Sequence, residues 1–326
     1  MERGYSKLVV LGGGTGIHPV IMAARLLMAH TSAIVAISDS GGSTGRLRKI
    51  FNHPAIGDLR QAISGMADPA TKPLVAELLE YRFQKGDGLQ GHTVGNLLLT
   101  ALQEITGSLQ SATDTCMQLL NIEGSVIPVS ETQTDLQITY TDGTTVVGQH
   151  ILNEHTTAPK KVAQISFTTP PVVSTQALSA IAEADVIVIG PGDYYDSILA
   201  TLLVPGIVEA LCKTTARIVT VVNLMSSQTR TDGMTASDQV RGIEKVLGRQ
   251  VMNIICNSQI IPAEIKKAYA QENSFPVVDD LGDDQRVIRA PLLEENRVTQ
   301  NPADVVSRSI LRHSSTKLVD ILKPLL

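Results

Sequence analysis

The chain has 326 residues, and 43% of them are apolar, which is enough to build a sizeable core and excludes a disordered protein. Its 27 lysines and arginines stand against 32 aspartates and glutamates, a net charge of −5, and only 3% of the residues are aromatic. No nucleic-acid partner is therefore expected, because the positive field and the stacking surfaces that such partners require are missing.

No apolar run approaches the roughly 18 residues that cross a bilayer, and the apolar stretch near the start is too short for a signal peptide. Three cysteines, Cys116, Cys212 and Cys256, are far apart and odd in number, which argues against a disulfide framework or a zinc site. We expect a cytoplasmic protein without membrane insertion, whose cysteines are buried thiols.

Short apolar runs rich in β-branched residues alternate with helical patterns along the chain. Because their apolar residues are continuous, these runs are typical of strands buried on both faces of a sheet. They fall at residues 7–11, 33–37, 185–189, 218–222 and 251–256. Apolar residues at helical spacing between residues 17 and 28 predict the first crossover helix. The expected fold class is α/β, with a mainly parallel sheet and helices on both faces.

The segment at about residues 124–170 departs from this alternation. Two runs of alternating polarity, 136–140 and 145–149, flank a turn sequence, and a further strand is expected at 162–167. We interpret the segment as a small β-rich insertion in a single α/β domain that spans residues 1–326, because no internal repeat or long linker is present.

A glycine-rich loop follows the first predicted strand and precedes the first helix. It consists of Gly12, Gly13, Gly14, Thr15 and Gly16. Free backbone N–H groups and the helix dipole favour an anion at such a turn. The loop is not a Walker A loop, because no Gly-Lys-Ser/Thr follows, and Ile17 occupies the third glycine position of G-x-G-x-x-G. It is a candidate phosphate site, and a tight turn without a ligand is the alternative.

The second predicted strand ends in a loop rich in glycine and hydroxyl side chains, and basic residues follow. Its candidate ligand-binding residues are Asp39, Gly41, Gly42, Ser43 and Thr44. Open α/β sheets bind ligands in the crevice beyond the carboxyl ends of their strands. Asp39 can contact a ribose hydroxyl, hold a magnesium ion that bridges phosphates, or act as a general base, and an Asx turn is the structural alternative.

Two predicted helix starts carry further polar candidates. Asp58 is expected to cap one helix, and Arg60 in its first turn can reach a phosphate or form a surface ion pair. His92 and Asn96 are four residues apart at the head of a strongly apolar helix, so they share one face of it. They either line a cleft or are hydrogen-bonded internally.

Two later strands also end in polar loops. Gly190 and Gly192 lie between a buried strand and a helix, which predicts a second anion pocket, and Asn223 and Ser226 follow the next strand. One ligand that carries a diphosphate, such as a nucleotide or nucleotide-sugar, explains all four loops together if they meet at one edge of the sheet.

The motifs at Gly12–Gly16, Asp39–Arg48, Gly57–Arg60, Gly91–Leu97, Gly190–Gly192, Leu203–Ile207 and Thr235–Asp238 occur in a specific order and spacing. Together they resemble the YvcK-like gluconeogenesis factor family of bacteria, and the resemblance runs from about Lys7 to at least Asp238. That family is related to CofD, a 2-phospho-L-lactate transferase that works with magnesium.

The resemblance implies a modified Rossmann-like fold, a cytoplasmic location and binding of a UDP-sugar of the UDP-N-acetylglucosamine type. It also implies a role in carbon metabolism and in cell-shape maintenance during gluconeogenic growth. It places Gly12–Gly16 around phosphates and gives Asp39 the acidic position that holds metal or acts catalytically in the transferase. It places Tyr269 near the nucleotide-sugar, whereas an exposed helix tyrosine is the ordinary interpretation of that residue.

Two functions compete on this basis. The first is a regulatory protein that binds a nucleotide-sugar, and the alternative is a transferase with Asp39 as its catalytic residue and Mg²⁺ as its cofactor. Where relatives commonly have paired acids, this chain has Asp39 followed by Ser40, which counts against magnesium-dependent transfer. The missing third glycine counts against a nicotinamide dinucleotide. The identity of the base and the formation of a homodimer stay open at this point.

Overall fold

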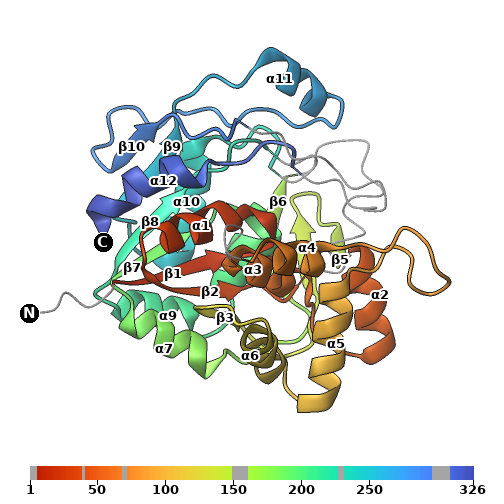
Figure 1. Ribbon diagram of the computed structural model, residues 1–326. Coiled ribbons are helices and arrows are strands. Elements are labelled where there is room, and N and C mark those ends of the chain that lie inside the picture. Colours follow the sequence, from red (N-terminus) through yellow and green to blue (C-terminus); the bar gives the residue numbers. More distant parts are fainter. Residues whose placement is uncertain (1–5, 39–40, 68–71, 149–160, 227–230, 296–308) are drawn as a thin grey trace, which may run out of the picture.

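The computed structural model describes residues 6–38, 41–67, 72–148, 161–226, 231–295 and 309–326 (Figure 1). Its centre is a seven-stranded sheet in the order β10-β9-β8-β7-β1-β2-β3, in which all neighbouring strands are parallel. The strands are β1 (Lys7–Gly12), β2 (His30–Val35), β3 (Ser125–Pro128), β7 (Val186–Ile189), β8 (Arg217–Val221), β9 (Asn253–Asn257) and β10 (Val287–Ala290).

The apolar runs predict five of these strands, and the structure confirms them with small shifts at their ends. Every residue of β1 after Lys7 is buried, as is every residue of β7, because helices cover both faces of the sheet. The sequence analysis does not predict β10, a short edge strand that contains the charged Arg289, or β3 as a member of the main sheet.

The helices that surround the sheet follow one another between the strands. They are α1 (His18–Leu26), α2 (Gly42–Phe51), α3 (Gly57–Met66), α4 (Pro73–Glu80), α5 (Val94–Thr106), α6 (Leu109–Leu119), α7 (Thr175–Glu183), α8 (Ala200–Leu202), α9 (Ile207–Lys213), α10 (Ala236–Leu247), α11 (Ala263–Ala270) and α12 (Ser315–Leu322). Shorter turns are η1 (Gly14–Gly16), η3 (Tyr194–Leu199) and η4 (Lys323–Leu325). The first crossover helix is confirmed as α1, which packs against α3 and α12.

The predicted β-rich insertion is present as a second, antiparallel sheet in the order β5-β4-β6. Its strands are β4 (Leu136–Tyr140), β5 (Thr145–Val147) and β6 (Val162–Phe167). Leu136, Ile138 and Tyr140 alternate along β4 and pack against Ala200, which attaches the small sheet to the main body. The expected segment begins with β3, but β3 pairs with β2 in the main sheet, so the small sheet starts only at Leu136.

The two ends of the described chain lie next to each other. The Ser6 hydroxyl donates to the carbonyl of Leu326 at 3.4 Å, and α12 packs along α1 (Figure 1).

No single helix among the described residues is long and apolar enough to cross a membrane, although the bent pair Tyr194–Leu202 and Ile207–Lys213 passes that test jointly.

The three cysteines are free thiols. Cys116 and Cys256 are buried as expected, and burial raises the pKa of Cys256 to about 12. The expectation is wrong for Cys212, which is exposed on the short helix α9 and donates to the carbonyl of Leu247.

Candidate functional site

Three of the four predicted loops meet in the structure. A Cβ atom added to Gly16 would overlap the backbone of Gly192, and Gly12 lies against Gly190. The side chain of Asn223 then binds the backbone of Gly192 twice: its Oδ1 accepts from the N–H at 3.1 Å, and its Nδ2 donates to the carbonyl at 2.8 Å. These contacts join the carboxyl ends of β1, β7 and β8 at the point where the strand order reverses, which is where Rossmann-like sheets bind ligands.

The first glycine loop has a backbone that only glycine adopts without strain at two positions. Gly12 has a φ of 152° and Gly14 a φ of 64°, and Gly14–Gly16 forms the turn η1 that leads into α1. Gly14, Thr15 and Gly16 are half-buried, so the turn is partly open to solvent. The amides that precede a helix are the groups that bind anions in such loops.

The other side of this loop is occupied by an acid. A Cβ atom at Gly13 would overlap Oδ2 of Asp58, and Oδ1 of Asp58 lies 3.6 Å from the equivalent position at Gly14. The predicted role of Asp58 as a helix cap is wrong: Ile56 is the N-cap of α3, and Asp58 is its second helical residue. Its side chain points to the glycine loop because α3 packs against η1.

The second loop delivers its hydroxyl residues to the start of α5. Ser43 Oγ and His92 Nδ1 are 2.9 Å apart, and Asn96 Nδ2 donates to Ser43 Oγ at 3.1 Å and to Thr44 Oγ1 at 3.4 Å. Burial, followed by the charges of Arg46 and Arg82, lowers the pKa of His92, which favours the neutral ring. The predicted pairing of His92 with Asn96 on one face is confirmed, together with internal hydrogen bonds.

One atom of this group has no partner. Asn96 Oδ1 is buried without a hydrogen bond, although the side chain as a whole is only 3% exposed. Gly41 is the N-cap of α2, and Gly42 begins the helix with a φ of 51°, so this helix also starts on glycine backbone. The start of α2 therefore combines free helix amides with hydroxyl and amide side chains.

Arg60 lies beneath this group and not in a surface ion pair. Its side chain is 2% exposed, it forms an ion pair with Glu80, and its aliphatic part fills the space next to Gly95. A Cβ at Gly95 would come within 2.7 Å of Arg60 Cγ. Arg60 therefore packs α3 against α5, and the structure shows its charge directed to Glu80.

Asp39, the acidic candidate, lies outside the described residues. Ser38, immediately before it, donates its hydroxyl to the carbonyl of Asp196 in η3 at 3.0 Å. The end of β2 is thereby held beside the loop that follows β7.

Ser226 and Tyr269 are held by C-terminal segments. Ser226 Oγ accepts from the N–H of Phe275 at 2.9 Å. Tyr269 is 8% exposed, its hydroxyl lies 2.6 Å from Ser309 Oγ, and it accepts from the N–H of Leu311 at 3.0 Å. The ordinary interpretation of Tyr269 as an exposed helix residue is therefore wrong.

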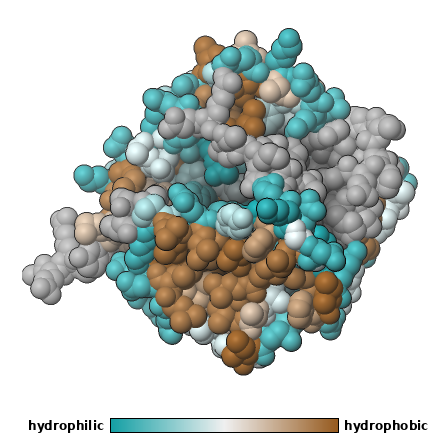
Figure 2. Space-filling view, turned by 45° about the vertical axis from the view of Figure 1, so that its right-hand side comes forward, coloured by the Kyte–Doolittle hydropathy of each residue, from teal (hydrophilic) through white to brown (hydrophobic). Residues whose placement is uncertain are grey.

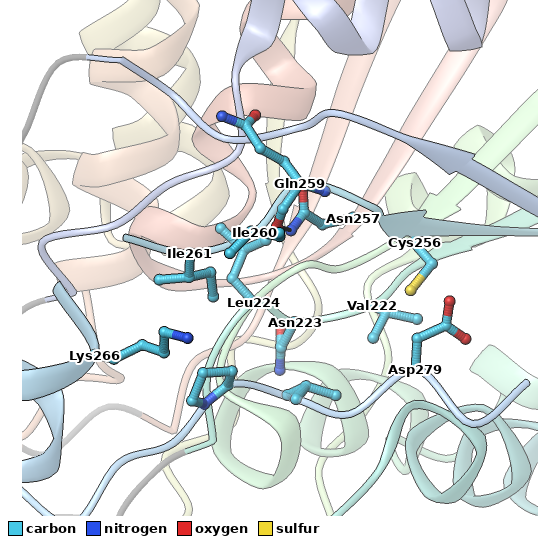
Figure 3. A pocket seen from close by; sticks show the side chains of 12 residues that line it. Val222, Asn223, Leu224, Cys256, Asn257, Gln259, Ile260, Ile261, Lys266 and Asp279 are labelled. Atoms are coloured by element: carbon cyan, nitrogen blue, oxygen red, sulfur yellow. Dashed lines mark hydrogen bonds between the residues drawn. The ribbon is translucent and has the colours of Figure 1, made fainter. Parts of the chain in front are cut away.

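A cavity of about 260 Å³ opens next to Asn223, beyond the carboxyl ends of β8 and β9 (Figure 3). Lys266 of α11 and Asn257 of β9 supply polar groups to it, while Cys256 and Asp279 face each other at one end. Asp279 is held by two contacts with Arg289, which keeps the pKa of this carboxyl below its usual value. The sequence analysis misses this cavity, because its walls come from three distant segments.

Magnesium is the cofactor that the transferase interpretation requires. Within the described residues, no group of three or more His, Cys, Asp or Glu side chains comes together as a metal site. The described side chains therefore do not form a site for the ion on their own, and no step of the proposals below is derived through it.

Thr235 and Asp238 belong to a motif of the resemblance and form the capping box of α10. Thr235 Oγ1 accepts from the N–H of Asp238 at 3.3 Å, and Asp238 Oδ2 accepts from the N–H of Thr235 at 3.1 Å. These bonds, with Arg241, hold the pKa of Asp238 below its usual value. The motif is thus explained by helix geometry.

We expect Thr235→Ala to lower the free energy of unfolding by about 1 kcal/mol, because an orphan helix amide loses its acceptor. Urea denaturation measures the change, and Thr235→Ser, which keeps the hydroxyl, is the matched control. Equal stabilities of the alanine and serine variants would contradict the assignment.

The comparisons with known proteins agree with this geometry. The CofD family, described as 2-phospho-L-lactate transferase CofD, matches residues 8–296. The Gluconeogenesis factor of Halalkalibacterium halodurans is 36% identical over 317 residues, which cover 94% of this chain and 95% of that protein. The Gluconeogenesis factor of Bacillus subtilis is 34% identical over 323 residues, 98% of each chain. The crystal structure of a protein from Bacillus halodurans matches with a TM-score of 0.87 at 34% identity, covering 98% of this chain and 100% of that one.

The fold and the loops define a Rossmann-like α/β protein with a glycine-loop site at the carboxyl ends of its strands. The chain belongs to the CofD family, in the branch whose members carry the name gluconeogenesis factor.

Proposed function

We propose that the protein binds a nucleotide-sugar of the UDP-N-acetylglucosamine type at the carboxyl edge of its sheet. The observation that carries the proposal is the direct contact of the loops after β1, β7 and β8 through Gly16, Gly192 and Asn223. A diphosphate needs several N–H donors from separate segments, and these loops bring such donors to one edge.

The phosphates bind at the two polar turns that follow the neighbouring strands β1 and β2 in this proposal. Thr15 and Gly16 supply the first turn, and Ser43 and Thr44 at the start of α2 supply the second. The carboxylate of Asp58 repels phosphate on the Gly13 side of the loop, which directs the ligand toward the opposite side. The buried Oδ1 of Asn96 is an acceptor available to a sugar or ribose hydroxyl.

Isothermal titration calorimetry with UDP-N-acetylglucosamine, UDP and GDP tests the proposal. We expect saturable heat with the UDP-sugar, and about 10-fold weaker binding for Ser43→Ala, because one hydrogen bond to the ligand or to Asn96 is lost. Ser111→Ala, on an exposed position of α6, is the matched control and keeps wild-type affinity. No heat with any of the three ligands at millimolar concentration would reject nucleotide binding.

The biological role that we propose is regulation of carbon metabolism and of cell shape during gluconeogenic growth. The family membership supports this role, since the named relatives are gluconeogenesis factors. A strain that lacks the protein is expected to grow normally on glucose and to lose growth and cell shape on a gluconeogenic carbon source. Rescue by wild type but not by Gly16→Ala, at equal protein levels, would connect the role to the glycine loops.

A CofD-like transferase is the second candidate, and the match over residues 8–296 favours it because that range includes all four loops. Transfer of a phospholactyl group from a guanosine diphosphate donor to a deazaflavin acceptor releases GMP. Incubation with donor, acceptor and Mg²⁺ is therefore expected to yield GMP, and Asp39→Asn to abolish it. Absence of GMP with a protein that binds UDP-N-acetylglucosamine would leave the regulatory function alone.

A further inference from the structure

Helices α4 and α5 form an outer layer of the molecule, and their outer surface is apolar as well as their inner one. They cover α3, which is buried along its whole length from Gly57 to Met66. Leu79 of α4 and Leu99 and Leu102 of α5 point inward and are buried. A helix that is apolar on all sides is one that is buried in the functional state of a protein.

The outer side of this layer is what we call the α4–α5 face. It consists of Leu74, Leu78, Tyr81, Val94, Leu97, Leu98, Ala101 and Ile105. The N–H of Val94 donates to the carbonyl of Tyr81 at 2.9 Å, so the end of α4 and the start of α5 are held together. Figure 2 brings this side of the molecule forward and shows a continuous hydrophobic area across its lower half.

The exposed area is larger than isolated surface residues explain. Leu74 is 74% exposed, Leu78 44%, Tyr81 54% and Ile105 79%. Together they expose on the order of 500 Å², with roughly 200 Å² for a fully exposed large side chain, and the largest apolar patch of a typical monomer is about 300–600 Å². The remaining members of the face bring the area toward the ~800 Å² per partner that a stable dimer buries.

The charges around the face favour a second copy of this chain as the partner. Neither α4 nor α5 contains a lysine or arginine, so the face does not offer the basic residues by which surface helices bind anionic membranes. Glu80 is paired with Arg60, and Glu104 is paired with His53, which leaves Glu77 as the remaining acid of the two helices. Two identical faces related by a two-fold axis can therefore meet with little like-charge repulsion, although the whole chain carries a charge of −5.

We infer that the protein is a homodimer whose two-fold interface is the α4–α5 face. The dimer covers the outer side of α5, and the inner side of the same helix carries Asn96 of the candidate site. The inference does not depend on which ligand the site binds.

Sedimentation equilibrium of the full chain between about 1 and 100 µM tests the inference. Wild type is expected at twice the chain mass of 34.8 kDa. The double variant Leu78→Glu/Ile105→Glu places four unpaired charges in the interface, which is expected to raise the dimer dissociation constant at least about 100-fold. Far-UV circular dichroism shows that the variant is folded, because both positions are solvent-exposed in the monomer.

Val172→Glu is the matched control, since Val172 is 73% exposed but lies outside the α4–α5 face, and this variant stays dimeric. A monomeric wild type over the whole range overturns the inference, including the case in which it sediments with phosphatidylserine vesicles. A folded double variant that dimerises as tightly as wild type assigns the interface to another face and equally overturns it.

Discussion

Replacing Gly16 by alanine is expected to lower the free energy of unfolding by about 3 kcal/mol and to abolish nucleotide binding. The added methyl group would overlap Cα of Gly192 and come within 2.5 Å of the carbonyl oxygen of Pro191 and 2.8 Å of the N–H nitrogen of Gly192. These are backbone atoms, so no side-chain rotation relieves the overlap. The loops after β1 and β7 must separate, and the shared amide site is lost with them.

Gly192→Ala is the control for this prediction, because it adds the same group from the other side of the same contact. Its nearest neighbour would be the carbonyl oxygen of Gly13 at 3.2 Å, which a shift of a few tenths of an ångström relieves. We expect a loss below about 1 kcal/mol for this variant. Urea denaturation gives both values, and equal losses would show that the two loops are not in the contact described.

The stability of the protein is expected to fall steeply between pH 6.5 and pH 4 because of two buried histidines. His313 is 5% exposed, and burial lowers its pKa to about 4, although its hydrogen bond to the carbonyl of Val222 acts in the opposite direction. Burial, and next the charge of Arg312, lower the pKa of His18 to about 4 as well.

The sign of the effect follows from where the protons bind. The unfolded chain takes up a proton on each histidine below about pH 6.5, whereas the folded chain resists it down to about pH 4. The stabilisation is therefore complete above pH 6.5 and lost as the pH falls toward 4, by on the order of 3 kcal/mol for each histidine. His92, whose pKa is also lowered, adds to the loss in the same direction. Carboxylates such as Asp238 and Asp279, whose pKa values are depressed, lose their contribution only below about pH 4.

His313→Gln is expected to remove roughly half of this slope, since glutamine keeps a donor for the carbonyl of Val222 but does not titrate. His30→Gln, at an exposed position of β2, is the matched control and leaves the slope as in wild type. Urea denaturation at half-unit steps from pH 4 to pH 7 measures the slopes. An unchanged slope in His313→Gln would show that this histidine titrates normally in the fold.

Much of the fold could be predicted from the sequence, because parallel strands buried on both faces leave a clear apolar signature. The run from Leu8 to Leu11 gives β1, and the glycines after it give the turn into α1. The strands with weak signals were missed for the same reason: β10 is an edge strand with a charged residue, and β3 resembles the insertion that follows it.

The candidate site could be predicted as a set of residues but not as a set of contacts. The sequence shows that Asn223 follows a strand, and only the structure shows that its amide binds Gly192. Tyr269 and Asp58 were misjudged because their partners lie about 40 residues away or on a different helix. Local patterns predict caps and surface positions, whereas tertiary packing decides where these two side chains point.

The adjacency of the chain ends has a consequence for engineering this protein. Because Ser6 bonds to Leu326 and α12 lies along α1, a short glycine-rich peptide can join the two ends with little closure entropy. New termini placed in the exposed turn at Gly86–Gly88 would then give a circularly permuted chain with every strand of both sheets intact. Such a permutant moves the break in the polypeptide from the β1 side of the molecule to the loop between α4 and α5.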